Sequence, residues 1–149
     1  MMNTELQNLV FKNENRYYDL KFNQLRIMQI KGESGIGKSL FCSDLKVKKN
    51  IDDNFKNVII FDFENSDMIN LIKDFSFYDY VVFDNADLYL TNELCSIIEK
   101  DILSNSKTHW IIIGRNSFSC VLSLACIGVL ERKTKGIKHF FSINYSKKS

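Results

Sequence analysis

Residues 32–39 read Gly-Glu-Ser-Gly-Ile-Gly-Lys-Ser and fit the pattern G-x-x-x-x-G-K-[ST]. In a loop of this kind the backbone N–H groups wrap a phosphate chain, and the positive end of the following helix assists them. Lys38 is expected to reach the β- and γ-phosphates, and the Ser39 hydroxyl is expected to ligate Mg²⁺. The sequence therefore predicts a phosphate-binding loop of the Walker A type. Its predicted binding residues are Gly32, Glu33, Ser34, Gly35, Ile36, Gly37, Lys38, Ser39 and Leu40.

A phosphate-binding loop needs a strand before it and a helix after it. Residues 26–31 form a short run that is β-branched at Ile27 and Ile30, which favours a strand. Residues 40–47 contain neither Gly nor Pro, which favours a helix. The local context therefore agrees with the motif.

Continuous apolar runs at residues 58–63, 80–84 and 110–114 are typical of strands buried on both faces. In residues 87–103, leucines and isoleucines recur at the spacing that places them on one face of a helix. Alternation of buried strands with helices predicts an α/β fold, with a mostly parallel central sheet and helices on both faces. Weaker patterns predict strands at residues 6–12, 17–22, 127–131 and 137–143, which form N-terminal and C-terminal β-hairpins, and helices at 68–73 and 118–125.

Asp84 ends the predicted strand at residues 80–84. This is the position of a Walker B aspartate, which holds Mg²⁺ directly or through water, opposite the loop hydroxyl of Ser39. The alternative is an aspartate that caps the next helix. The metal role is favoured because a Walker A loop requires such a partner.

With these motifs, residues 26–116 resemble the P-loop ATPases with an added central strand, the group that contains AAA+, recombinase-type and ABC ATPases. No closer family is indicated. The resemblance implies a three-layer P-loop NTPase fold, with residues 1–149 as a single nucleotide-binding domain that uses ATP and Mg²⁺. The chain lacks the Leu-Ser-Gly-Gly-Gln signature of ABC ATPases and the Asn-Lys-x-Asp motif for guanine. The residues after Asn116 are too few for the helical lid of AAA+ proteins.

The resemblance also suggests which groups would orient the attacking water. AAA+ proteins usually carry a glutamate directly after the Walker B aspartate, but here that position is Asn85. An amide cannot accept a proton as a carboxylate does, so hydrolysis at such a site should be slow. Glu64 is similar to the catalytic glutamate of recombinase-like ATPases, although a solvated loop acid is the alternative. Asp87 is another substitute and suits a helix N-cap equally well.

Two further groups depend on the strand at residues 110–114. Asn116 matches the place of a polar "sensor 1" residue in AAA+ proteins, and Arg115 could supply positive charge to a phosphate. A plain Gly-Arg-Asn turn explains both residues equally well. Tyr17 and Tyr18 precede the loop at a distance compatible with stacking on adenine, but ordinary packing in the hairpin is favoured.

Length, composition and charge limit the possible size and class of the protein. The chain has 149 residues, 45% of them hydrophobic, and a formal charge of +2, which predicts one folded domain. Residues 107–149 hold eight Lys or Arg and one acid. A nucleic-acid contact through this basic region is not favoured over a solvated face. The cysteines lack metal-ligand spacing and no apolar run is long enough for a bilayer, so a cytoplasmic protein without membrane contact is expected.

The favoured function is an ATP-binding, Mg²⁺-dependent ATPase whose hydrolysis is slow or stimulated by a partner. Its catalytic residues would be Lys38, Glu64, Asn85, Asn116 and Arg115. The alternative is a nucleotide-gated module that binds a protein partner, or its own copy, without significant turnover. A small-molecule kinase ranks last, because such enzymes usually need an arginine-bearing lid and arginines are few in this chain.

Overall fold

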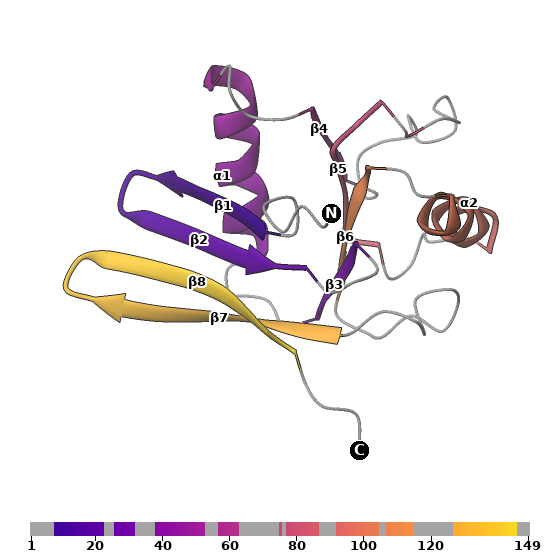
Figure 1. Cartoon of the computed structure of the whole chain (residues 1–149). Coiled ribbons are helices and arrows are strands. Elements are labelled where there is room, and N and C mark those ends of the chain that lie inside the picture. The colour runs from indigo at the N-terminus through magenta and orange to yellow at the C-terminus, as the bar shows by residue number, and fades with distance from the viewer. Residues whose placement is uncertain are drawn as a thin grey trace, which may run out of the picture.

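The computed structural model describes residues 8–22, 26–31, 38–52, 57–62, 75, 77–86, 92–104, 107–114 and 127–145. Within these residues the chain forms eight strands and two helices (Figure 1). They are β1 (Asn8–Asn13), β2 (Arg16–Lys21), β3 (Ile27–Lys31), α1 (Lys38–Ile51), β4 (Val58–Asp62), β5 (Tyr80–Asp84), α2 (Asn92–Leu103), β6 (His109–Gly114), β7 (Ile127–Lys135) and β8 (Lys138–Tyr145).

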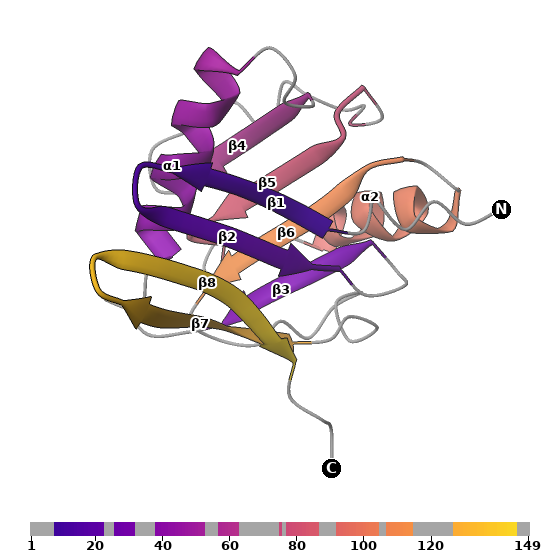
Figure 2. The ribbon, with the colours of Figure 1, turned by 60° about the vertical axis from the view of Figure 1, so that its left-hand side comes forward.

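All eight strands belong to one sheet in the order β1-β2-β8-β7-β3-β6-β5-β4. Strands β7, β3, β6, β5 and β4 pair in parallel, as do β2 and β8. The β1–β2 and β7–β8 pairs are antiparallel hairpins. The sheet curls strongly, so that β1, β2, β8 and β7 turn across the front of the central strands (Figure 2).

The prediction of a three-layer P-loop NTPase fold is wrong for this structure. The described chain is mostly strand, its single curled sheet has mixed orientation, and only two helices accompany it. The physical cause lies in the hairpins. The start of β7 pairs in parallel with β3, and β8 pairs in parallel with β2, so both hairpins extend the central sheet. Hydrophobic patterns reveal which residues are buried but not which strand edges pair.

Individual elements lie close to their predicted positions. The strands at 26–31, 58–63, 80–84 and 110–114 are found within one residue of each predicted end. Helix α1 is longer than expected, and β7 and β8 extend to a two-residue turn at Gly136 and Ile137, where Gly136 has a φ of 59°. The predicted helices at 68–73 and 118–125 lie outside the described residues.

Two hydrophobic clusters cover the two faces of the central strands. Helix α1 contributes Phe41 and Leu45 to a cluster with the inner faces of both hairpins and of the central strands. Helix α2 contributes Ile98 to a second cluster on the opposite face, which includes Trp110. Because the sheet curls around it, α1 packs against strands on two sides (Figure 2). In this way the hairpins help to position α1.

A buried polar cluster joins the N-terminal hairpin to α1. The Asp44 carboxylate, in a residue that is 2% exposed, accepts hydrogen bonds from Arg16, Tyr18 and Asn13. Arg16 donates through Nε and Nη2, both at 2.7 Å. Burial alone would raise the pKa of Asp44, but the donated hydrogen bonds outweigh it and lower the pKa overall.

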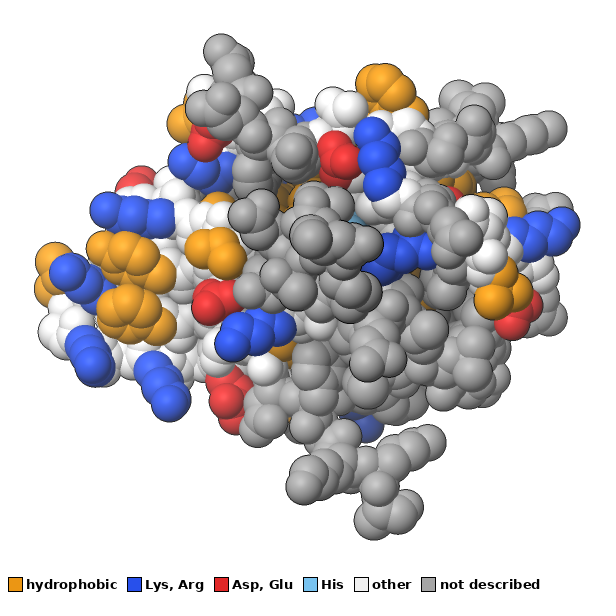
Figure 3. Space-filling model, in the orientation of Figure 1, with side chains coloured by type: hydrophobic (Ala, Val, Ile, Leu, Met, Phe, Trp, Pro, Cys, Tyr) orange, Lys and Arg blue, Asp and Glu red, His pale blue; other side chains and the backbone are white. Residues whose placement is uncertain are grey.

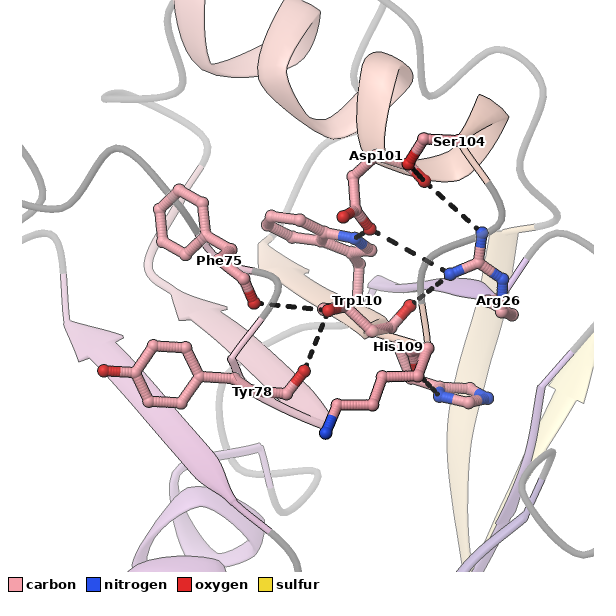
Figure 4. Close-up of polar contacts among 9 residues, drawn as sticks. Arg26, Phe75, Tyr78, Asp101, Ser104, His109 and Trp110 are labelled. Atoms are coloured by element: carbon pink, nitrogen blue, oxygen red, sulfur yellow. Dashed lines mark hydrogen bonds and ion pairs between the residues drawn. The ribbon is translucent and has the colours of Figure 1, made fainter.

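A second polar cluster joins α2 to the amino ends of the central strands (Figure 4). The Trp110 indole donates to the Asp101 carboxylate at 2.8 Å, and Arg26 donates to the Thr108 carbonyl at 2.7 Å. The Thr108 hydroxyl donates to the Tyr78 carbonyl at 2.8 Å. These bonds satisfy polar groups at the amino ends of the strands, opposite to the phosphate-binding motif. We therefore infer that they stabilise the fold. Among the described helices, none is long and apolar enough to cross a membrane.

Candidate functional site

The candidate site lies where the central parallel strands end. Strands β3, β6, β5 and β4 run in the same direction, so their last residues share one edge of the sheet. Those residues are Lys31, Gly114, Asp84 and Asp62. Helix α1 begins at Lys38, seven positions after the end of β3. The predicted phosphate-binding loop therefore joins the carboxyl end of a central strand to a helix N-terminus.

Asp84 and Asp62 are neighbours at this edge. They are register partners in the β4–β5 pair, and both continue the strand face that packs against α1. The Cys42 thiol of α1 donates a hydrogen bond to the Asp84 carboxylate. Lys38 precedes Cys42 by four residues and Ser39 precedes it by three, so both lie on the adjoining surface of the helix. The start of α1 and the predicted metal ligand are therefore close together.

The electrostatics of the pair are unfavourable for two negative charges. Burial is the largest cause that raises the pKa of Asp84, and the nearby charge of Asp62 raises it further. Hydrogen bonds from the Cys42 thiol and the Asn85 backbone N–H, together with the charge of Lys46, act in the opposite direction. Burial and the same carboxylate also raise the pKa of Cys42, so the buried thiol keeps its proton and serves as a donor.

Asn85 links the two carboxylates. Its backbone N–H donates to Asp84 Oδ1 at 2.9 Å, and its side-chain Nδ2 donates to Asp62 Oδ1 at 3.0 Å. Its φ of 56° is in the left-handed region, which asparagine tolerates better than most residues. In this arrangement the side-chain amide of Asn85 is hydrogen-bonded to Asp62 and orients that carboxylate.

We expect substitutions of Asn85 to separate its two contributions. Asn85→Gly removes the bond to Asp62 but tolerates the positive φ, and should cost about 1 kcal/mol of unfolding free energy. Asn85→Ala loses the same bond and adds backbone strain, at a further cost of about 1 kcal/mol. Urea unfolding followed by fluorescence of the single tryptophan measures both values. An alanine variant as stable as the glycine variant would contradict a strained backbone at this position.

The structure describes some of the predicted site residues and not others. Helix α1 begins with Lys38, Ser39 and Leu40. Ser39 is exposed, and Leu40 packs against the hydrophobic cluster that contains Phe41 and Leu45. Asp84 ends β5, and Asn85 follows it. The predicted residues Gly32, Glu33, Ser34, Gly35, Ile36, Gly37, Glu64, Arg115 and Asn116 lie outside the described residues, as does Asp87.

The two tyrosines considered for adenine stacking have different environments. Tyr18 is 1% exposed, lies between Phe11 and Phe141, and donates its hydroxyl to Asp44. Tyr17 faces the other side of the sheet and stacks on Phe140 at 4.9 Å. Packing within the hairpins, the favoured expectation, is confirmed for both residues.

The residues at the sheet edge fit a hard divalent cation. Mg²⁺ prefers oxygen ligands, and it commonly uses one or two carboxylates with phosphate oxygens and water. Asp84 and Asp62 supply such carboxylates. A cation would offset both the burial and the neighbouring charge of Asp62, which raise the pKa of Asp84. Within the described ranges no group of three or more His, Cys, Asp or Glu side chains gathers as a metal site. A cation here would therefore depend on a phosphate ligand to complete its coordination.

Sequence reasoning missed two members of this site. Asp62 ends a buried apolar strand as Asp84 does, so the same signal could have identified it. No sequence pattern indicated a role for Cys42, because its contact with Asp84 depends on how α1 lies against the sheet.

Comparisons with known proteins leave the family open. No family model matches the sequence, and a search of curated proteins found no match. Among solved structures, the chain is similar to a chain described as "Model of ribosome-bound archaeal Pelota and ABCE1", with a TM-score of 0.43 and 12% sequence identity. The match covers 93% of this chain and 34% of that chain, so this chain spans about a third of its length. A likeness this weak supports no conclusion about fold or function.

Proposed function

We propose that this chain binds ATP with Mg²⁺ at the carboxyl edge of its central strands and hydrolyses it slowly, or when a partner stimulates it. One observation carries the proposal. The Walker A motif at residues 32–39 connects β3 to α1, and α1 contacts Asp84 at the end of β5 through Cys42. A phosphate-binding loop and a carboxylate for its metal need this proximity.

The arrangement of strands gives further support. β6 lies between β3, which precedes the motif, and β5, which carries Asp84. Ligands of parallel sheets bind beyond the carboxyl ends of the strands, which is where the motif and both aspartates occur.

Each residue has a role in this proposal. Lys38 binds the β- and γ-phosphates, and the N–H groups of the loop neutralise their charge. Asp84 and Ser39 would hold Mg²⁺, which supplies positive charge to the phosphate oxygens when bound. Asn85 keeps Asp62 oriented beside Asp84. Glu64, Asn116 and Arg115 remain candidates for orienting water or for contacting the terminal phosphate.

A nucleotide-gated interaction module is the second candidate. The observation that favours it is the engagement of Asn85, whose amide is bonded to Asp62 and cannot act as a general base. Nucleotide binding without turnover would then change the affinity for a protein partner. Turnover on the order of 1 per second would exclude this candidate.

Isothermal titration with ATP, ADP and GTP in the presence of Mg²⁺ tests the proposal. We expect ATP to bind, and we expect Lys38→Ala to weaken that binding about 10- to 100-fold, because charge-assisted hydrogen bonds to phosphate are lost. Lys49→Ala is the matched control, since Lys49 is an exposed lysine in the last turn of the same helix.

Phosphate release measured on the same proteins separates the two candidates. Release that depends on Mg²⁺ and on Lys38 supports an ATPase, whereas binding without release supports the interaction module. The proposal fails if the wild-type chain binds no nucleotide, or if the Lys38 and Lys49 variants bind ATP as tightly as the wild type does.

A further inference from the structure

The outer face of the two hairpins carries an exposed aromatic pair among lysines. On the inner face of these strands, Phe11, Tyr18 and Phe141 stack in the core with centroid distances of 4.5 and 4.7 Å. On the outer face, Tyr17 and Phe140 stack at 4.9 Å, and Phe140 is 37% exposed. The inner rings are buried in the core, whereas the outer pair packs on the surface of the sheet.

The strand register places basic side chains around this pair. Lys12 and Lys133 occupy the same cross-strand row as the two rings, one at each end. The Lys12 ammonium lies 5.2 Å from the centre of the Tyr17 ring. Lys135 and Lys138 form the next outward-facing row, nearer the hairpin turn, and both are exposed. We call these six residues the outer aromatic–lysine face.

The two acids of the outer strand face stand to one side. Asp19 and Glu131 lie in the row on the far side of the aromatic pair from the hairpin turns, together with Val10 and Ser142. Among the described residues, no carboxylate forms an ion pair with Lys133, Lys135 or Lys138. Figure 3 shows the result over β1, β2, β8 and β7, where hydrophobic side chains are flanked by blue ones and most red ones lie towards the middle of the molecule. A further acid, Glu14, is exposed in the β1–β2 turn.

We propose that the outer aromatic–lysine face binds single-stranded nucleic acid, a function that goes beyond nucleotide binding at the sheet edge. Aromatic side chains on an exposed sheet offer rings on which unpaired bases stack, and nearby lysines contact the phosphates. A duplex keeps its bases stacked inside, so it would use the lysines but not the rings. The aromatic pair therefore favours single strands over duplexes.

Fluorescence anisotropy with an end-labelled oligothymidylate of about 15 nucleotides tests this surface on the full chain. We expect the wild type to bind the single strand more tightly than a duplex of the same length. Replacing both rings by Tyr17→Thr and Phe140→Thr should weaken binding at least about tenfold, because base stacking is lost. Threonine is chosen because it suits a strand.

The lysines give a second, independent measurement. The combined Lys133→Gln, Lys135→Gln and Lys138→Gln variant should bind more weakly, and the slope of log affinity against log salt should become less steep by about 2. Two controls should bind as the wild type does. Phe77→Thr removes an aromatic ring that is 67% exposed elsewhere, and Lys49→Gln with Lys100→Gln removes exposed helical lysines.

Several outcomes would overturn the proposal. The first is a wild type that does not bind the oligonucleotide, and the second is an aromatic variant that binds it as tightly as the wild type does. The third is a duplex bound at least as tightly as the single strand. The fourth is a wild type that binds anionic phospholipid vesicles or polyglutamate but not the oligonucleotide. If the double aromatic variant fails to fold by circular dichroism, Phe140→Thr alone and the lysine variant decide the question. Lys38→Ala should leave oligonucleotide binding unchanged, which separates this proposal from the nucleotide site.

Discussion

Replacing Asp44 by alanine is expected to lower the unfolding free energy by about 3 kcal/mol. The carboxylate accepts bonds from Arg16 at 2.7 Å, from Asn13 at 2.7 Å and from Tyr18 at 2.5 Å. Its loss leaves the guanidinium of Arg16 without its partner and the buried Tyr18 hydroxyl without its acceptor. An uncompensated charge costs more than the pair contributes, because the desolvation is no longer offset. Urea unfolding, followed through the buried Trp110, measures the change.

A control directly after the same helix distinguishes the effect of burial from the effect of charge. Asp52 pairs with Lys48 at 3.4 Å on the surface, so Asp52→Asn should cost at most about 1 kcal/mol. If Asp44→Ala costs no more than Asp52→Asn, the buried cluster does not hold the hairpin on α1.

The same cluster should shape the acid stability of the protein. The pKa of Asp44 is lower in the folded chain than its ordinary value, which is about 3.9 in the unfolded chain. Its stabilising contribution is therefore complete above that unfolded pKa and is lost as the pH falls through the folded pKa. The Asp44→Ala variant should lack this part of the acid transition.

Asp84→Asn should reduce Mg²⁺-dependent phosphate release by about 100-fold or more, provided that the proposed ATPase function holds. The amide is a poorer metal ligand and removes the negative charge that would hold Mg²⁺ opposite Ser39. The folded protein should be at least as stable as the wild type, because burial and the neighbouring Asp62 raise the pKa of Asp84 and so disfavour its charged form. Loss of activity without loss of stability is the signature of a functional carboxylate.

Asp79→Asn is the matched control for this prediction. Asp79 precedes the opposite end of the same strand, where it pairs with Lys107 at 3.5 Å and accepts the Asn57 backbone N–H at 3.1 Å. Its substitution should leave phosphate release unchanged. Equal activity of the Asp84 variant and the wild type, measured with saturating Mg²⁺ and ATP, would remove Asp84 from the mechanism.

Much of the local structure could be read from the sequence. The apolar runs at β4, β5 and β6 identified buried strands, because a strand covered on both faces must be apolar throughout. The Walker A motif could be placed between a strand and a helix, because glycines and the adjacent apolar periodicities are local signals. The role of Asp84 as a candidate ligand followed from its place at the end of such a strand.

The tertiary structure alone decided which strand edges pair and which distant side chains meet. Pairing of β8 with β2 and of β7 with β3 makes one curled sheet out of the hairpins and the central strands, and backbone hydrogen bonds of this kind leave no mark on side-chain periodicity. The register of β4 on β5 sets Asp62 beside Asp84, and the docking of α1 adds Cys42. The outer pair of Tyr17 and Phe140 arises in the same way, since each residue alone resembles an ordinary strand aromatic. Motifs made of neighbouring residues can therefore be recognised in the sequence. A site assembled across strands depends on pairings between segments that are far apart in the chain.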